Sequence, residues 1–296
     1  MRPFYFQEAP GRRLAAVRVL VFGFALGWLV GYAKVVLSVL AFPAHRFAPI
    51  GVVSLLEAPL PKPLGLAIWG VAVIASAAAL LGAFYRVAAP VSALALLWVA
   101  TYRSSWGMIF HTENLLVMHA LVLAVAPAAD AWSIDAWRDP SRRARGDEVH
   151  ARYGVGLRLM AMITVTAYVL AGIAKLRAAG GVWLDGDVLL SHVAWDNLRK
   201  LELGDLHSPI GAFFCRTPEV FGPLAWTSLL LELGAPLALL GPRLGRLWSF
   251  GIWAFHLGVL VLMAIAFVYP LTGIAFAPFL APERWVDRLR GQSRRN

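Results

Sequence analysis

The chain has 296 residues, of which 59% are hydrophobic and only 15% are charged, and its mean hydropathy is +0.68. A soluble globular protein of this length is excluded, and apolar runs of about 20 residues indicate membrane-spanning helices rather than a barrel of alternating strands. The net charge of +10 is concentrated in short segments beside the apolar runs, so it indicates membrane topology and not nucleic-acid binding.

We predict an all-α bundle of about eight spans, or seven, with a cytoplasmic N-terminus. A basic arm over residues 1–18 precedes a membrane domain over 19–281, and a basic cytoplasmic tail follows over 282–296. The predicted spans are about 19–42, 64–84, 87–102, 106–126, 155–176, 222–240, 247–268 and 270–281. Between the first two, five prolines within residues 43–63 favour a segment that lies along the outer surface.

The fourth span is placed by a length argument. Its uninterrupted apolar run, residues 115–126, is too short to cross a bilayer. We therefore predict that the helix begins near Trp106. This places His111, Glu113 and Asn114 in its outer turns, where ionisable groups are costly beside lipid.

The second half of the chain alternates charged loops with apolar runs. Residues 133–152 form the most charged loop, which we expect on the cytoplasmic side, and residues 177–221 form the longest external segment. Within that segment, residues 187–203 predict a helix that lies on the membrane or caps the bundle. Pro236 predicts a kink in the sixth span, and the shortness of 270–281 leaves a re-entrant segment as the alternative to an eighth crossing.

The best candidate for chemistry is one face of the fifth span. At helical spacing this face carries Thr164, Tyr168, Ala171, Gly172 and Lys175. Its small residues allow a neighbouring helix to approach, while the hydroxyls and the amine share one groove. The alternative for a lysine at a helix end is that its amine only reaches for the membrane surface.

Other ionisable groups are predicted at similar depth in the outer half of the membrane. Counted from the outer ends of their spans, Lys34 and Glu232 lie at one level, which predicts either a buried ion pair that fixes helix packing or a part of a site. His111 and Asn114 share a helix face and could line a pocket with Lys175. His119 and His256 could equally be satisfied by a neighbouring backbone or hydroxyl group. The lone Cys215 excludes an internal disulfide, and no Cys/His set has zinc spacing.

These residues resemble a known family. The run Ala171-Gly172-Ile173-Ala174-Lys175-Leu176, followed by Trp183 and Gly186, is similar to the signature of the HTTM (horizontally transferred transmembrane) family, which includes the membrane domain of vitamin K-dependent gamma-glutamyl carboxylases. The resemblance covers about residues 10–281. Further matches are residues 111–116, Trp132-Ser133-Ile134-Asp135, Leu231-Glu232-Leu233 and Phe255-His256-Leu257.

The resemblance implies a quinone chemistry. In the carboxylases a lysine at the position of Lys175 is held to deprotonate the vitamin K hydroquinone, and a lysine does this only where desolvation lowers its pKa. This chain reads His111-Thr112-Glu113-Asn114 where the carboxylases have an Asn-His pair, and it has no counterpart of their large external domain. A shared quinone or lipid pocket is therefore expected, and carboxylation of protein glutamates is not.

Together these patterns predict a multi-pass protein of a bacterial plasma (inner) membrane. Its expected partners are the lipid bilayer and a small lipophilic ligand. The possible cofactors are a quinone or a hydroquinone. The expected catalytic residues are Lys175, His111 and Asn114. The expected binding residues are Tyr168, Gly172, Trp183, Glu232 and His256. The alternative is a non-catalytic transporter or assembly partner in which the buried charges are structural.

Overall fold

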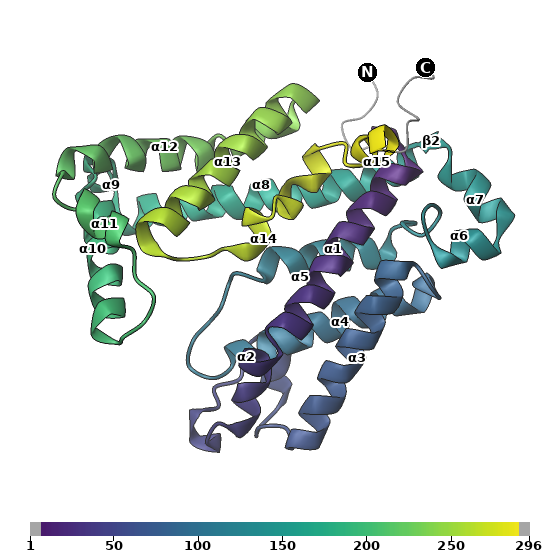
Figure 1. The fold of residues 1–296 in the computed structure, drawn as a ribbon, viewed down its shortest axis with the longest axis horizontal. Coiled ribbons are helices and arrows are strands. Elements are labelled where there is room, and N and C mark those ends of the chain that lie inside the picture. The colour runs from purple at the N-terminus through teal and green to yellow at the C-terminus, as the bar shows by residue number, and fades with distance from the viewer. Residues whose placement is uncertain (1–6, 290–296) are drawn as a thin grey trace. The chain divides into compact units, whose positions relative to one another are not determined.

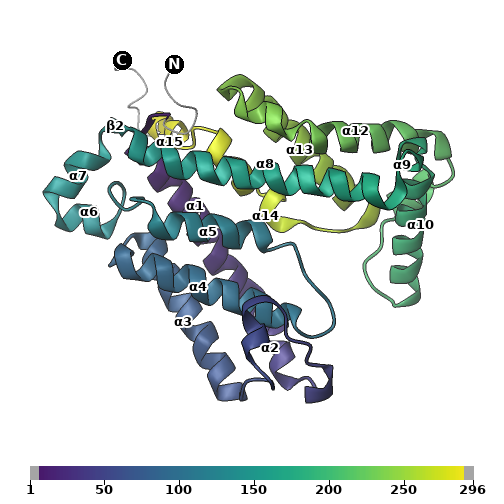
Figure 2. The ribbon, with the colours of Figure 1, turned by 180° about the vertical axis from the view of Figure 1, so that it is seen from behind.

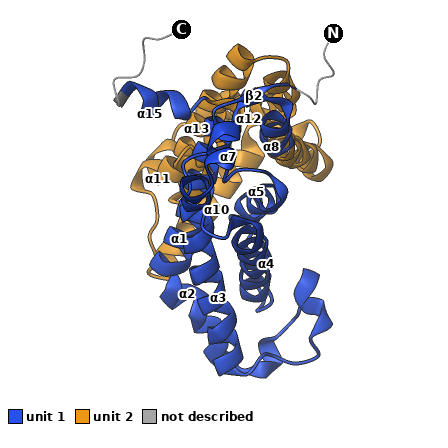
Figure 3. Cartoon of the chain, turned by 90° about the vertical axis from the view of Figure 1, so that its right-hand side faces the viewer, with its two compact units in different colours: residues 1–160, 281–296 blue, residues 161–280 orange. Residues whose placement is uncertain are grey.

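The structure, a computed structural model, describes residues 7–289, so Arg2 and the tail from residue 290 lie outside the described residues. It is built almost entirely of helices (Figure 1). The single domain expected from the sequence is divided into two compact units, residues 1–160 with 281–296, and residues 161–280 (Figure 3). The long helix α8, Ala151–Ala179, contributes its beginning to the first unit and the remainder to the second.

The first unit is organised around three long helices. These are α1 (Gly11–Gly31), α3 (Lys62–Leu81) and α4 (Tyr85–Ser104). The shorter elements are β1 (Ala9–Pro10), α2 (Ala33–Ser38), η2 (Val39–Ala41), η3 (Ala44–Arg46), η4 (Gly51–Leu55), α5 (Asn114–Val125), α6 (Ile134–Arg138), α7 (Pro140–Gly146), β2 (Val149–His150) and α15 (Glu283–Leu289). The two-residue strands β1 and β2 pair antiparallel.

The first helix begins earlier than Val19, because the arginines of the expected arm have partners in the fold. Arg12 pairs with Asp147 at 2.6 Å and Arg13 with Glu283 at 2.8 Å. Arg18 is fully buried and donates to the carbonyl oxygens of residues 128, 131 and 132. Both terminal nitrogens of the guanidinium meet carbonyl oxygens and only Nε has no partner, so burial of Arg18 is largely compensated and the helix extends through it.

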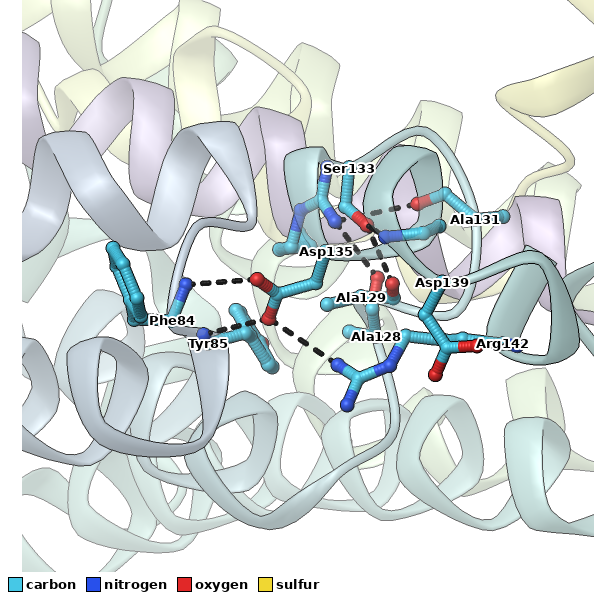
Figure 4. Close-up of polar contacts among 11 residues, drawn as sticks. Phe84, Tyr85, Ala128, Ala129, Ala131, Ser133, Asp135, Asp139 and Arg142 are labelled. Carbon is cyan, nitrogen blue, oxygen red and sulfur yellow. Dashed lines mark hydrogen bonds and ion pairs between the residues drawn. The ribbon is translucent and has the colours of Figure 1, made fainter.

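The segment after α5 places a carboxylate, Asp135, at the beginning of α4. Asp135 accepts hydrogen bonds from the N–H groups of Phe84 and Tyr85, both at 2.9 Å, and from Arg142 at 3.2 Å (Figure 4). A carboxylate on the first N–H groups of a helix satisfies donors that have no partner within the helix. The Trp-Ser-Ile-Asp run of the sequence is therefore a structural element in this protein.

The helix predicted from Trp106 onward is shorter than expected. The chain turns after α4, with Gly107 at φ 95°, and α5 begins only at Asn114. The prediction was wrong because it required a full crossing by one continuous helix. The polar residues before α5 instead have partners in the unit, since Glu113 accepts from Arg103 at 3.2 Å and from the Trp28 indole at 3.1 Å.

The second unit contains the end of α8 and one further long helix, α13 (Pro242–Met263), which is seen from behind in Figure 2. Its shorter elements are α9 (Val182–Asp185), α10 (Asp187–Glu202), α11 (Pro209–Phe214), η5 (Pro218–Val220), α12 (Phe221–Leu233), η6 (Ala235–Leu239), α14 (Val268–Leu271) and η7 (Ile274–Phe279). The expected helix over 187–203 is present as α10.

Two expectations about breaks in the second unit have different outcomes. The kink expected at Pro236 is a full end of the α-helix, because α12 ends at Leu233 and a 3-10 helix over Ala235–Leu239 follows. The eighth crossing is not a continuous helix. Residues 268–279 form only α14 and the short η7, and Tyr269, Phe276 and Ala277 are buried inside the unit. Gly273 at φ 76° and Pro278 interrupt any longer helix.

Within residues 7–289, five helices are long and apolar enough to cross a membrane. They are α1, α3, α4, α8 and α13. The helix α5 is apolar but has only 12 residues, and α12 has 13. The prediction of many apolar helices is thus confirmed, whereas the number of crossings and the side of the N-terminus stay predictions.

Candidate functional site

One side of α8 meets α12 closely enough for their polar side chains to touch. Gly172 allows this approach, because a Cβ at this position would lie 2.8 Å from Leu233 Cδ2 and 3.1 Å from Glu232 Cβ. One turn further along α8, the same face carries Lys175 toward the same neighbour. The small residue that the sequence singled out is therefore what brings the lysine to α12.

Lys175 forms an ion pair with Glu232. The amine nitrogen lies 2.6 Å from Glu232 Oε1, and the side chains are 21% and 3% exposed. Two aromatic rings flank the amine, with the centroid of Trp183 at 5.1 Å and that of Phe255 at 5.3 Å. The charge is thus held by a carboxylate and two ring faces, a setting in which its interactions are stronger than in water.

Tyr168, two turns before Lys175, forms a second polar contact with α13. Its hydroxyl lies 2.7 Å from Nε2 of His256, and both side chains are buried. The ring of Tyr168 also contacts Trp248 and Phe276 edge-on or tilted, at 5.4 and 6.3 Å between centroids. His256 therefore has a hydroxyl group as its partner, which is one of the two interpretations that the sequence left open for it.

We call Tyr168, Lys175, Trp183, Glu232 and His256 the lysine–glutamate cluster. Within it, two buried polar atoms have no hydrogen-bond partner, Glu232 Oε2 and His256 Nδ1. Glu232 is 3% exposed and His256 is 5% exposed, so protein atoms shield both from solvent. A buried polar atom without a partner is costly, which makes such atoms candidates for contact with a ligand.

The structure places the other predicted catalytic residues in the first unit. The His111 carbonyl accepts a backbone hydrogen bond from Asn114, which opens α5, while Lys175 belongs to the second unit. The five residues of the cluster, together with Gly172, are brought together within the second unit, and His111 and Asn114 belong to the first. His119 is fully buried in the first unit and hydrogen-bonds the backbone of Met160.

The predicted pairing of Lys34 with Glu232 is replaced by another partner. Helix α1 ends at Gly31, and Lys34 lies on the short α2 with an exposed side chain. Glu232 pairs with Lys175 instead. Counting residues from span ends does not give the direction in which the carboxylate points.

Several residues of the second unit were not singled out from the sequence. Phe255 was quoted only as a family match, although its ring flanks the Lys175 amine. Asn197, Lys200 and Ser208 are buried and bond the last carbonyls of α13, which are Leu262, Met263 and Val261. The signal that could have found them is a lysine and an asparagine spaced three apart in an otherwise amphipathic helix.

The cluster has the groups needed for proton exchange with a lipophilic ligand. A carboxylate with one free oxygen, an amine, and a tyrosine–histidine pair lie together at the end of a membrane-length helix. Among residues 7–289, no group of three or more His, Cys, Asp and Glu side chains could hold a metal ion.

Comparison with known proteins matches the chain to the HTTM domain over residues 6–285, a range that includes the whole cluster. No curated protein and no solved structure matches the chain. The match covers nearly the full length, and its apolar helices are those of an integral membrane protein. The chain therefore belongs to the HTTM family of membrane proteins.

Proposed function

We propose that this protein binds a lipophilic ligand with a ring hydroxyl, a quinone or hydroquinone being the candidate class, at the lysine–glutamate cluster, and that Lys175 acts as the base toward it. The observation that carries the proposal is the unpaired, buried Glu232 Oε2 on the same carboxylate that holds Lys175. The bacterial inner membrane as its location is part of the same prediction.

The unpaired Glu232 Oε2 defines which kind of hydrogen-bonding group a ligand needs. Carboxylate oxygen only accepts hydrogen bonds, so Oε2 selects a donor such as a hydroxyl. The rings of Trp183 and Phe255, beside the Lys175 amine, offer apolar surface to an aromatic ligand. A hydroquinone combines both features, since its ring is apolar and its edge carries O–H donors.

The proton transfer involves only this chain's groups and the ligand. When the lysine is a neutral amine, the ligand O–H bond breaks, an N–H bond forms at Nζ, and the electron pair stays on the ligand oxygen. The resulting ammonium faces both that oxygen and Glu232. Charge stabilisation of this kind is strongest where water is excluded, and Glu232 is almost fully buried.

Tyr168 and His256 are proposed to orient this arrangement. Their hydrogen bond fixes the ring of Tyr168 two turns before the lysine, and His256 Nδ1 is a second buried atom without a partner. His111 and Asn114, which lie in the first unit, are proposed as further catalytic residues from the sequence pattern alone.

The test uses protein purified in a mild detergent and in lipid nanodiscs. Mass spectrometry of the retained small molecules identifies the natural ligand, and a naphthohydroquinone probe, whose absorbance changes on deprotonation, reports the proton transfer. We expect the wild type to retain a ring-containing lipid and to deprotonate the probe at lower pH than in empty nanodiscs. No retained ligand and no shift of the probe would contradict the proposal.

The matched variant is Lys175→Arg. Arginine keeps the positive charge beside Glu232 but cannot give up its proton, so it preserves the ion pair and removes the base. We expect this variant to fold and bind the probe without deprotonating it. Deprotonation equal to wild type in Lys175→Arg would exclude Lys175 as the base and leave the carboxylate as the acceptor.

A purely structural role is the alternative, as expected for a transporter or an assembly partner. The observation in its favour is that Glu232 Oε1 already engages the Lys175 amine. In this alternative the ion pair has no other task than to join α8 to α12. If Lys175→Met with Glu232→Gln leaves folding and ligand retention unchanged, the pair has this role.

A further inference from the structure

The helix α10 buries two polar side chains and exposes three large apolar ones. Asn197 is 5% exposed and Lys200 is 8% exposed, beside the apolar Val193 at 1%. Trp195, Leu198 and Leu201 are 65%, 49% and 59% exposed, and the polar side chains that share their side of the helix are Ser191, His192, Arg199 and Glu202. In water this distribution exposes the apolar groups that folding normally buries, so it indicates that another apolar phase covers them.

The buried polar side chains of this region cap the end of α13. The side chains of Ser208, Asn197 and Lys200 donate to the carbonyl oxygens of Val261, Leu262 and Met263, at 2.5, 2.9 and 2.6 Å. These carbonyls belong to the last turn of α13, where a helix has acceptors without partners and where a cation is favourable. The buried side of α10 is thus fixed to the end of α13.

This attachment sets the level of α10 relative to a bilayer. The helix α13 is one of the helices long and apolar enough to cross a membrane, so its capped end lies at the boundary between hydrocarbon and water. In Figures 1 and 2, α10 runs across the direction of α12 and of the end of α8, another such helix. A helix crossing the span direction at a span end lies along the membrane surface.

The apolar surface continues beyond α10 into α11, which packs beside it. We call residues 187–216 the α10–α11 hairpin. Its exposed large apolar side chains are Trp195, Leu198, Leu201, Leu203, Leu206, Ile210, Phe213 and Phe214. Tryptophan, phenylalanine and leucine are the residues with which interfacial helices enter the boundary between headgroups and acyl chains.

The charge of the hairpin indicates which lipid is needed. It carries four acidic and three basic side chains, the acids being Asp187, Asp196, Glu202 and Asp205. Attraction to anionic headgroups is therefore not the driving force. The driving force is instead the burial of apolar area, which contributes roughly 25 cal/mol per Å².

We infer that the α10–α11 hairpin is a membrane-surface element, whose Trp195, Leu198 and Leu201 face enters the acyl-chain boundary of the leaflet at the end of α13. The occupant of this face is phospholipid, and neutral phosphatidylcholine suffices. The inference does not depend on the ligand proposed for the lysine–glutamate cluster.

Site-directed spin labelling in nanodiscs tests it. In a Cys215→Ser background, a nitroxide is attached at Leu198→Cys and, as the control in the charged loop before α8, at Glu148→Cys, whose side chain is 52% exposed. Collisions with oxygen, which concentrates in lipid, are compared with collisions with a water-soluble nickel chelate. We expect the oxygen-to-nickel ratio to be several-fold higher at position 198 than at 148, and equal in phosphatidylcholine and phosphatidylglycerol nanodiscs.

A second label at Leu201→Cys keeps the test independent of one variant's folding, and the same high ratio is expected there. Free access of the nickel chelate to positions 198 and 201 would overturn the inference, because the face would then lie in water. Protection from both reagents would also overturn it, because a protein, either a second copy or another partner, would then cover the face.

Discussion

At the residue scale, the partner of Glu232 shows where reading the sequence reaches its limit. Residue spacing placed Tyr168, Gly172 and Lys175 on one face, and the structure has all three on the side of α8 that meets α12 and α13. Spacing could not tell which cation meets Glu232, because that depends on where α1 ends and how α12 is rotated. Both are decided by packing between helices distant in sequence.

The ion pair gives a first prediction. Lys175→Met leaves Glu232 buried without its cation, which we expect to lower the free energy of unfolding by about 3 kcal/mol. Glu232→Gln added to this variant should recover most of the loss, because the neutral amide carries no uncompensated charge. A double-mutant cycle from thermal or denaturant unfolding in micelles checks the coupling. Additive effects of the two substitutions would show that the pair contributes nothing.

The glycine that admits α12 gives a second prediction. Gly172→Val places methyl groups where Leu233 and Glu232 already lie, and we expect a loss of about 1–3 kcal/mol. The control is Gly258→Val in α13, where a Cβ would meet nothing within 4 Å, so only the small cost of β-branching applies. Equal unfolding midpoints of the two variants would argue against the close approach.

At the scale of the element, local patterns were sufficient wherever an element is defined by its own residues. The helix over 187–203 and the break at Pro236 were predicted, since amphipathic spacing and a missing N–H act locally. The start of α5 at Asn114 was missed. The expectation of a crossing helix rested on the length needed to span a bilayer, whereas the chain turns after α4, and Arg103 and Trp28 supply partners for Glu113 before α5 begins.

The capping of α13 gives a third prediction. Lys200→Met removes a charged donor from the Met263 carbonyl, which we expect to cost about 1.5–3 kcal/mol and to speed amide exchange in the last turn of α13. Arg199→Met is the control, because Arg199 pairs with the same Asp196 but donates to no carbonyl of α13. Hydrogen exchange followed by mass spectrometry distinguishes them. Equal exchange in both variants would refute the capping role.

At the scale of the whole molecule, composition predicted a helical membrane protein, and the family match agrees. The division into two compact units was not predictable, because the length and composition of an apolar run do not specify the other helix against which it packs. The discontinuity of the first unit, which takes residues from both ends of the chain, is likewise a tertiary property.

A fourth prediction concerns the link between those ends. Glu283→Gln removes the carboxylate that pairs with Arg13, and since the two side chains are 5% and 25% exposed, we expect a loss of about 1–3 kcal/mol and faster amide exchange at the start of α1. Glu148→Gln, which breaks an exposed pair with Arg152, should cost at most about 0.5 kcal/mol. A reversed order of the two effects would show that the terminal link is not structural.

The same link has a consequence for the order of folding. Glu283 is synthesised 270 residues after Arg13, so the first helix is made long before its acidic partner exists. The first unit therefore acquires this contact only after the whole second unit has been synthesised, and a nascent chain stopped before residue 283 lacks it.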